Sequence, residues 1–382
     1  MKILHTSDWH VGRTIRGRSR ADEHREVLAE IVAIAGGREV DLVIVAGDLF
    51  DTAAPSPESE QIVYEALLAL TRVAAKVVII AGNHDNPARL RAVKPLLLPA
   101  NVICGDYPRG AAKGGLVELS LGGTEVRIAL MPFVSQRQIV RASQLMELEG
   151  LENTREYQVH VEAMLEQLAE GFRTDAVNLV VSHSAVVGGG PSGSEREAHI
   201  FDYYVPASVF PVAANYVALG HFHGCQRVPG PGLLWYSGSP LQLDFGEAGQ
   251  EKQVLLVDAH PGLPATVEPV PLAAGRRLRT IEGAEDEVLV QGLAAGDDYL
   301  RATIAGPRRA GMADELRGQL PNLVEIRLAG TDPGLKHATE ARADRPYTEL
   351  FGEYLEERNA SDKRVEALFG ELLEELDAPE TA

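Results

Sequence analysis

The sequence predicts an α/β fold in which a layered β-sheet core is flanked by helices. Five short runs rich in Val, Ile and Leu are typical of buried strands; they cover residues 2–6, 41–46, 76–81, 178–181 and 216–219. Helix-like stretches lie between them, at residues 23–35, 57–73 and 156–172. Strands that alternate with helices favour a sheet covered by helices.

Each predicted strand is followed by side chains of the kind that bind metals. In open α/β folds, side chains just beyond the carboxyl ends of strands converge on one crevice. Residues far apart in the sequence can therefore surround one ion. The candidates, in chain order, are Asp8 and His10, Asp48, Asn83 beside His84, His183, and His221 with His223.

A second, smaller domain is predicted after the first, which we assign to residues 1–270. The following segment, residues 271–340, has a β-α-β-α-β pattern that predicts a small α+β domain. Its predicted elements cover residues 277–281, 285–293, 299–304, 312–320 and 323–328.

The last segment, residues 341–382, has helical periodicity, with a break at residues 359–362. Apolar residues fall on one face of each predicted helix. Such helices either pack on their own domain or dock to a partner protein, and the sequence leaves both open. The apolar positions are Tyr347, Leu350, Phe351, Tyr354 and Leu355, then Val365, Leu368, Phe369, Leu372, Leu373 and Leu376.

Composition limits the class of protein. The chain has 382 residues, long enough for a large core and a further domain. Cys104 and Cys225 are its two cysteines, too few for a disulfide framework. With no apolar leader at the N-terminus, we expect a soluble cytoplasmic protein, associated with the nucleoid when on DNA.

Charge is unevenly distributed along the chain. The net charge of -19 argues against a free-standing protein that coats nucleic acid, since non-specific DNA affinity comes from Lys and Arg. Five arginines follow the first metal motif, however, and could form a basic lip that holds a phosphate backbone. A solvated loop explains them equally well. They are Arg13, Arg16, Arg18, Arg20 and Arg25, of which the first four are our candidates for substrate binding.

The predicted ligands suit two divalent cations. Asp and His offer oxygen and imidazole donors that accept manganese, iron or zinc, and Mn²⁺ is our first choice. Two metals about 3.5 to 4 Å apart can hold the oxygens of an in-line phosphoryl displacement. Asp48 is the natural bridging carboxylate, because Gly47 lets the backbone pass close to a ligand.

These motifs together resemble those of the calcineurin-like metallophosphoesterases. Each fragment alone is weak, but their conjunction in this order is specific. The resemblance implies that family's layered β-sheet core flanked by helices, with a small α+β capping domain and a C-terminal helical tail. The matching segments are Asp8-x-His10, Gly47-Asp48, Gly82-Asn83-His84-Asp85, His183 and Gly220-His221-Phe222-His223.

Three further segments are similar to the SbcD family of bacterial nuclease subunits. The resemblance implies a manganese-dependent DNA nuclease that cuts at double-strand ends and hairpins in repair and recombination. It also implies a homodimer within a heterotetramer, bound through the C-terminal helices to an SbcC-like ATPase. The segments are residues 5–10, residues 47–51, and residues 236–240 followed by Phe245-Gly246-Glu247.

The resemblance also implies a role for each site residue. One metal would be held by Asp8, His10, Asp48 and His223, and the other by Asp48, Asn83, His183 and His221. His84 would contact the scissile phosphate and help the leaving oxygen. We hypothesise that Asp51 or Asp85 orients His84; the alternative is that these two acids cap the helices that begin near Pro57 and Pro87.

Other functions remain open at this stage. No Arg follows Asp48 closely, whereas protein phosphatases of the superfamily use one there to clamp a phosphomonoester dianion. This favours a phosphodiester substrate, either DNA or a small molecule such as a cyclic nucleotide. A catalytically silent scaffold would not need the full ligand set. For a homodimer, the candidate interfaces are residues 57–73, with Ile62, Val63, Ala66, Leu67 and Leu70, and residues 90–98.

Overall fold

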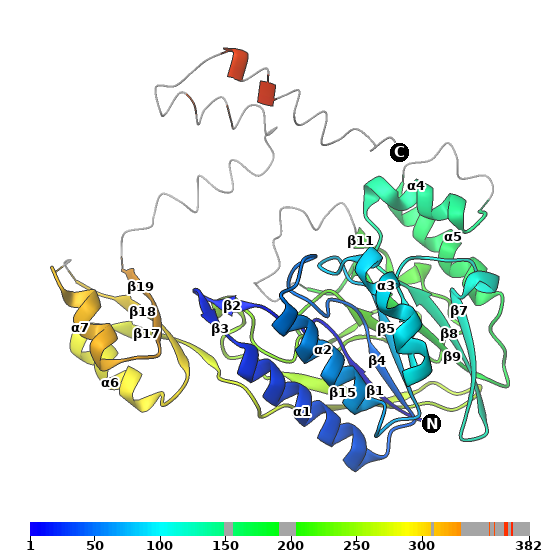
Figure 1. Cartoon of the computed structure of the whole chain (residues 1–382), viewed down its shortest axis with the longest axis horizontal. Coiled ribbons are helices and arrows are strands. Elements are labelled where there is room, and N and C mark those ends of the chain that lie inside the picture. Colours follow the sequence, from blue (N-terminus) through cyan, green and yellow to red (C-terminus); the bar gives the residue numbers. More distant parts are fainter. Residues whose placement is uncertain are drawn as a thin grey trace.

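Two six-stranded sheets lie face to face in the core of the larger domain (Figure 1). The computed structural model describes residues 1–148, 156–190, 204–306 and 309–329, together with residues 351, 355, 363–365, 368 and 369. Short strand pairs outside these sheets are β2 (Thr14–Ile15) with β3 (Arg18–Ser19), and β10 (Ala185–Val186) with β11 (Tyr204–Val205).

The first sheet has the order β16-β15-β1-β4-β5-β6. Strands β1, β4, β5 and β6 run parallel, β15 runs antiparallel to β1, and β16 runs antiparallel to β15. The strands are β1 (Lys2–Thr6), β4 (Leu42–Val45), β5 (Lys76–Ile80), β6 (Val102–Gly105), β15 (Gln253–Asp258) and β16 (Thr266–Pro271).

The second sheet has the order β13-β14-β12-β9-β8-β7. Strands β14, β12, β9 and β8 are parallel, and an antiparallel strand flanks them on each side. The strands are β7 (Leu116–Leu121), β8 (Thr124–Met131), β9 (Val177–His183), β12 (Tyr216–Gly220), β13 (Gln226–Val228) and β14 (Leu234–Tyr236).

The central strands of each sheet are buried on both faces, which explains why they are continuously apolar. In β1, Ile3 joins the core between the sheets, and Leu4 joins the core beneath the helices. Helices cover the outer face of each sheet, so the fold has four layers. They are α1 (Ala21–Arg38), α2 (Pro57–Leu70) and α3 (Pro87–Leu97) on the first sheet, and α4 (Gln136–Leu145) and α5 (Tyr157–Ala169) on the second.

The caps of α2 and α3 correct one alternative raised by the sequence. Ser56 accepts a hydrogen bond from the backbone N–H of Ser59, and a proline occupies the first turn of each helix. Asn86 accepts from the N–H groups of Ala88 and Arg89. Asp51 and Asp85 therefore do not cap these helices, because the residue directly before each proline does so.

The small domain is a three-stranded parallel sheet with two helices and its own apolar core. Figure 1 shows it in yellow and orange beside β2 and β3. Because β16 ends at Pro271 and Leu272 still packs in the first core, the junction lies between Leu272 and Leu278. Its elements are β17 (Leu278–Gly283), α6 (Glu285–Ala294), β18 (Tyr299–Ile304), α7 (Met312–Gln319) and β19 (Leu323–Leu328).

Most of the predicted tail, residues 341–382, lies outside the described residues. Of those described, Phe351 and Phe369 come from the two predicted helices, and their rings stack with centroids 4.0 Å apart. Among the helices that the structure describes, none is long and apolar enough to cross a membrane. The docking role of the tail stays a prediction.

The predicted dimer interface stays a prediction, but the five apolar residues named for it on α2 are buried, while Leu68 on the same helix is 43% exposed. Ile62, Val63 and Leu67 are at most 3% exposed because they form the core between α2 and the first sheet, as do Ala66 and Leu70. At the end of α3 and just after it, Leu96 and Leu98 are exposed by 76% and 61%. Helical periodicity reveals an apolar face but not what covers it.

Arg20 joins the two domains and does not face solvent. Its guanidinium, fully buried, pairs with Glu23 at 2.7 Å and contacts the carbonyls of Gln242 and Arg276. Glu23 also accepts from the N–H of Arg276. Arg20 is therefore removed from the predicted DNA-binding residues, since an exposed basic lip cannot include it.

Replacing Arg20 with methionine should lower the free energy of unfolding by about 3–5 kcal/mol, because Glu23 is left buried without its counter-charge. The measurement is urea unfolding of the full chain, with Arg18→Met as the control at an exposed position. If Arg20→Met weakened DNA binding and left stability unchanged, the structural role of Arg20 would be refuted.

Candidate metal centre

The predicted ligands come together at the carboxyl edge of both sheets. Asp8 and His10 follow β1, Asp48 follows β4 and Asn83 follows β5, while His183 ends β9 and His221 and His223 follow β12. The loops after β1 and β4 are tied together, because Asp8 and His10 donate backbone hydrogen bonds to Gly47 and Asp48. Strands of both sheets thus contribute residues to one site.

Several of these residues have a strained backbone. Asp8, His10 and Asp48 have φ values of 52°, 45° and 52°, and His221 has a φ of 117°. Non-glycine residues rarely adopt this left-handed region, and such strain is concentrated at functional sites. The surrounding fold must hold these ligands in place against their local preference.

Asp48 lies between the two halves of the site. Its Oδ2 is 3.4 Å from Nε2 of His10 and 3.5 Å from Nε2 of His183. Its Oδ1 accepts a hydrogen bond from the backbone N–H of His84. Gly82 must be glycine here, because a Cβ would collide with the Asp48 carboxylate.

On one side of Asp48, three donors converge. Asp8, His10 and His223 place ligand atoms within 4.8 Å of one another. The rings of His10 and His223 pack edge to face, with centroids 4.9 Å apart. Nε2 of His10 is buried and has no hydrogen-bond partner among the described residues. An imidazole nitrogen in that position fits a metal ion.

On the other side, the oxygen of Asn83 meets two histidines. Oδ1 of Asn83 is 3.0 Å from Nε2 of His183 and 3.0 Å from Nδ1 of His221. His183 donates from Nδ1 to the carbonyl of Ala46, which directs its other nitrogen toward Asn83 and Asp48. The second predicted ligand set therefore has its donors together.

The electrostatics of the site favour cations. Burial raises the pKa of Asp8, and the adjacent Asp48 charge adds to this. Burial also raises the pKa of Asp48, but nearby His183 and His10 outweigh it and bring that pKa below its usual range. Burial and the charge of His183 lower the pKa of His221 to about 3, leaving the neutral imidazole that binds metals.

His84 is oriented by a main-chain group. Its Nδ1 donates to the carbonyl oxygen of Asp51 at 2.8 Å, and its ring packs edge to face on His10. The Asp51 carboxylate instead lies 3.5 Å from Nδ1 of His10 and pairs with Arg13 at 3.3 Å. Asp51 thus orients His84 through its backbone, which the hypothesis of an orienting carboxylate did not foresee.

Asp85 holds two ligand loops together. Its carboxylate accepts from the N–H groups of Leu49, Phe50 and Gly82. Burial and the charge of Asp48 raise its pKa to about 7, against the effect of these hydrogen bonds. These three donors belong to the backbone beside Asp48 and Asn83, so the role of Asp85 is to shape the site rather than to orient the His84 ring.

The site is open on one side. Asp8, His10, Asp48, His183 and His223 are buried. A second group, Asn83, His84 and His221, is exposed or partly exposed. A phosphate can therefore approach from the side of the second group.

The remaining arginines of the predicted basic lip differ in surroundings. Arg13 pairs with Asp51 beside the site. Arg16 is turned toward the small domain, where it pairs with Glu325 at 2.8 Å, and it also pairs with Asp244 of the larger domain at 3.4 Å. Arg18 is exposed on β3. Arg13 and Arg18 stay candidates for contact with substrate.

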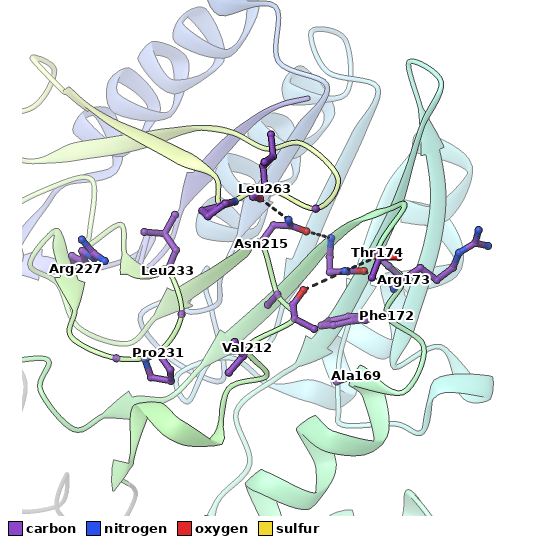
Figure 2. Close-up of a pocket in the computed structure, with 17 residues that line it drawn as sticks. Ala169, Phe172, Arg173, Thr174, Val212, Asn215, Arg227, Pro231, Leu233 and Leu263 are labelled. Atoms are coloured by element: carbon purple, nitrogen blue, oxygen red, sulfur yellow. Dashed lines mark hydrogen bonds between the residues drawn. The ribbon is translucent and has the colours of Figure 1, made fainter.

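A cavity of about 640 Å³ lies at the opposite edge of the second sheet, where β9, β12 and β14 begin (Figure 2). The side chain of Asn215 accepts from the N–H of Asn178 and donates to the carbonyls of His260 and Leu263. These side-chain amides hydrogen-bond backbone groups. None of the predicted metal ligands lines the cavity.

Glu247 is a buried acid that the sequence analysis quoted in a motif but gave no role. Its Oε1 is 3.0 Å from Nδ1 of His223, and its Oε2 is 2.6 Å from Nζ of Lys252. Apart from that motif, the sequence offered an acid and a lysine five positions apart, with the aromatic Phe245 two residues before the acid. Such a pair is usually solvated, so its burial could not be foreseen.

Residues 1–225 match the family model described as calcineurin-like phosphoesterase. A curated relative from Bacillus subtilis (strain 168), the SbcD component of the nuclease SbcCD, is 39% identical over 73% of this chain and 71% of its own length. The chain belongs to the SbcD family of calcineurin-like phosphoesterases. This membership confirms the predicted fold class and makes the chain a metal-dependent phosphoesterase.

Other SbcD sequences match along more of the chain or at lower identity. The SbcD protein of Rhodobacter capsulatus is 32% identical over 92% of this chain and 82% of its own. That of Escherichia coli (strain K12) is 30% identical over 74% and 71%. Among solved structures, a dimetal phosphatase from Danio rerio covers 72% of this chain and 99% of its own, with a TM-score of 0.40 and 11% identity.

Proposed function

We propose that this SbcD-family chain is a manganese-dependent DNA nuclease that hydrolyses phosphodiesters at double-strand ends and hairpins in repair and recombination. The observation that carries the proposal is the position of Asp48, whose one carboxylate oxygen faces His10 on one side and His183 on the other. A carboxylate shared between two sets of donors suits a pair of divalent cations.

We assign one cation to Asp8, His10, Asp48 and His223, and the other to Asp48, Asn83, His183 and His221. Two divalent cations bound there would supply Lewis-acid stabilisation of the phosphate oxygens. Their oxygen and imidazole donors suit Mn²⁺.

His84 is the candidate catalytic residue. Its Nδ1–H is held by the carbonyl of Asp51, which leaves Nε2 available for substrate, and the residue is partly exposed. In the imidazolium form, with both nitrogens protonated, it can donate a hydrogen bond from Nε2 to the scissile phosphate and give that proton to the leaving oxygen. Neither of the two proposed ligand sets includes it.

The substrate proposal rests on family membership and on the surroundings of Asp48. The residues after it, Leu49 and Phe50, are buried and supply no guanidinium. Arg13 does approach, but it pairs with Asp51. A phosphodiester carries one charge and needs less clamping than a phosphomonoester, so DNA fits this environment.

For a partner, we propose an SbcC-like ATPase bound by residues 341–382, in a heterotetramer with two copies of this chain. The supports are the name of the relatives, which describes one component of a complex, and the acidic charge of the chain. A protein with net charge -19 gains little DNA affinity by itself, and a partner can supply it.

The deciding experiment is digestion of linear duplex DNA with Mn²⁺, comparing free with blocked ends. It is run with and without the co-purified ATPase, with the chain ending at residue 340, and with a cyclic nucleotide as competing substrate. We expect cleavage of free ends, stimulation by the ATPase, and loss of that stimulation and of a salt-stable complex in the shortened chain.

Each comparison in this experiment can refute one part of the proposed function. Faster turnover of the cyclic nucleotide than of DNA would favour a small-molecule phosphodiesterase. A complex that persists without residues 341–382 would contradict the docking role of the tail. Equal rates with Mg²⁺ or Zn²⁺ would contradict the preference for manganese.

A further inference from the structure

The carboxylate of Glu247 sits behind the ring of a proposed metal ligand. Glu247 is fully buried, and its Oε1 lies 3.0 Å from Nδ1 of His223. A carboxylate accepts hydrogen bonds, so Nδ1 of His223 carries the proton and donates it. In the neutral ring Nε2 is then the unprotonated nitrogen, which is the form that can bind a cation.

The other oxygen of Glu247 is fixed by donors. Oε2 is 2.6 Å from Nζ of Lys252 and accepts from the N–H of Leu243 at 3.1 Å. Lys252 also donates to the carbonyl of His223 at 3.0 Å and to Oγ of Ser239 at 2.9 Å. One lysine thus holds both the backbone of His223 and the carboxylate behind its ring.

The short helix that carries Glu247, η6 (Phe245–Glu247), is held from two sides. Arg301 of the small domain lies over the Phe245 ring, 4.3 Å from its centroid. Asp244, just before η6, pairs with Arg16 at 3.4 Å and with Arg301 at 3.8 Å. The carboxylate is therefore presented from a turn that both domains keep in place.

We propose that Glu247 is a positioning residue, which holds the His223 ring in the orientation and tautomer required to bind a divalent cation. The inference rests on the proposed function, because it takes His223 as a ligand. A histidine that binds a metal commonly donates its other N–H to a carboxylate, and losing that partner costs about 10–100-fold in metal affinity.

Glu247→Gln tests this with little change in shape. The N–H of Leu243 and the ammonium of Lys252 both require an oxygen at the Oε2 position, so the new amide NH₂ must face His223. Nδ1 can then only accept, which moves its proton to Nε2 and blocks that nitrogen. We expect Mn²⁺ affinity at one site to fall about 10–100-fold by titration calorimetry of the full chain.

A second readout separates positioning from general stability. With ¹⁵N-labelled histidine, the nitrogen shifts of His223 in the metal-free protein should report an Nδ1–H tautomer in the natural chain and an Nε2–H tautomer in Glu247→Gln. Thermal unfolding of each variant is recorded alongside. Glu251→Gln, an exposed acid four positions away, makes the same charge change and should leave both readouts unaltered.

Glu247→Asp provides a second variant, since it keeps the charge for Lys252 but is one methylene short of His223. His223→Ala provides the reference. If His223→Ala binds Mn²⁺ like the natural chain, the ligand assignment of the proposed function fails. If His223→Ala binds weakly while folded Glu247→Gln or Glu247→Asp binds normally, with the tautomer unaltered, the positioning role is overturned.

Discussion

Replacing Asp48 with asparagine is expected to reduce phosphodiester hydrolysis on the order of 10³-fold. The amide keeps an oxygen that can accept from the N–H of His84, so the loop should survive. The lost charge is the one that lies between Nε2 of His10 and Nε2 of His183, at 3.4 and 3.5 Å. A neutral group there cannot compensate two neighbouring cations.

The measurement is the initial rate on linear duplex DNA with Mn²⁺, together with the amount of metal that stays bound after desalting. Asp22→Asn is the matched control, because Asp22 is exposed on α1 and pairs with Arg25. A variant at Asp48 that retained both its metal and at least half of its rate would show that the carboxylate does not bridge the site.

Replacing His84 with alanine should lower kcat by about 10²–10⁴-fold while metal binding is retained. His84 belongs to neither proposed ligand set, and its ring is held by the Asp51 carbonyl beside the ring of His10. Its loss therefore removes a contact to the phosphate and leaves the cations in place.

Rates on DNA and Mn²⁺ titration of the same preparation test this split, with His260→Ala as the control at an exposed histidine. Full activity in His84→Ala would remove it from the mechanism whichever substrate is right. Loss of metal together with activity would instead make His84 a ligand, consistent with its ligand atoms lying near those of His10 and Asp48.

The sequence was a good guide where one local pattern repeats. The run at residues 2–6 is β1, and the run at residues 76–81 is β5 with one residue added. In the small domain, the predicted strand at residues 299–304 is β18. Continuous β-branched runs mark strands that are covered on both faces, because such strands need no polar face.

Other strands could not be predicted from a continuous apolar run. Strand β7 alternates between buried and exposed residues, and Glu118 and Ser120 face outward at the edge of its sheet. Its partner β8 was not predicted either, although it lies inside the sheet and its last six residues are buried; there Arg127 interrupts the apolar run. An edge strand with one solvent-exposed face has a weaker hydrophobic pattern in the sequence than a central strand, since only about half of its residues need to be apolar.

For charged residues, too, the local sequence does not reveal which side chains are buried or what they pair with. Arg13, Arg16, Arg18 and Arg20 are alike in the sequence, yet Arg20 is buried against Glu23 and Arg16 is turned to Glu325. Arg16 and Glu325 are 309 residues apart along the chain, so no local pattern could pair them. Long-range ion pairs are set by how the domains dock.

The sequence by itself determined which residues can bind metal and that each follows a strand, because donor type and strand pattern are both local properties. The tertiary structure decided how those donors face one another: Asp48 between His10 and His183, the Asp51 carbonyl behind His84, and Glu247 behind His223. These contacts join loops from two sheets and a distant turn. Their geometry exists only once the chain has packed.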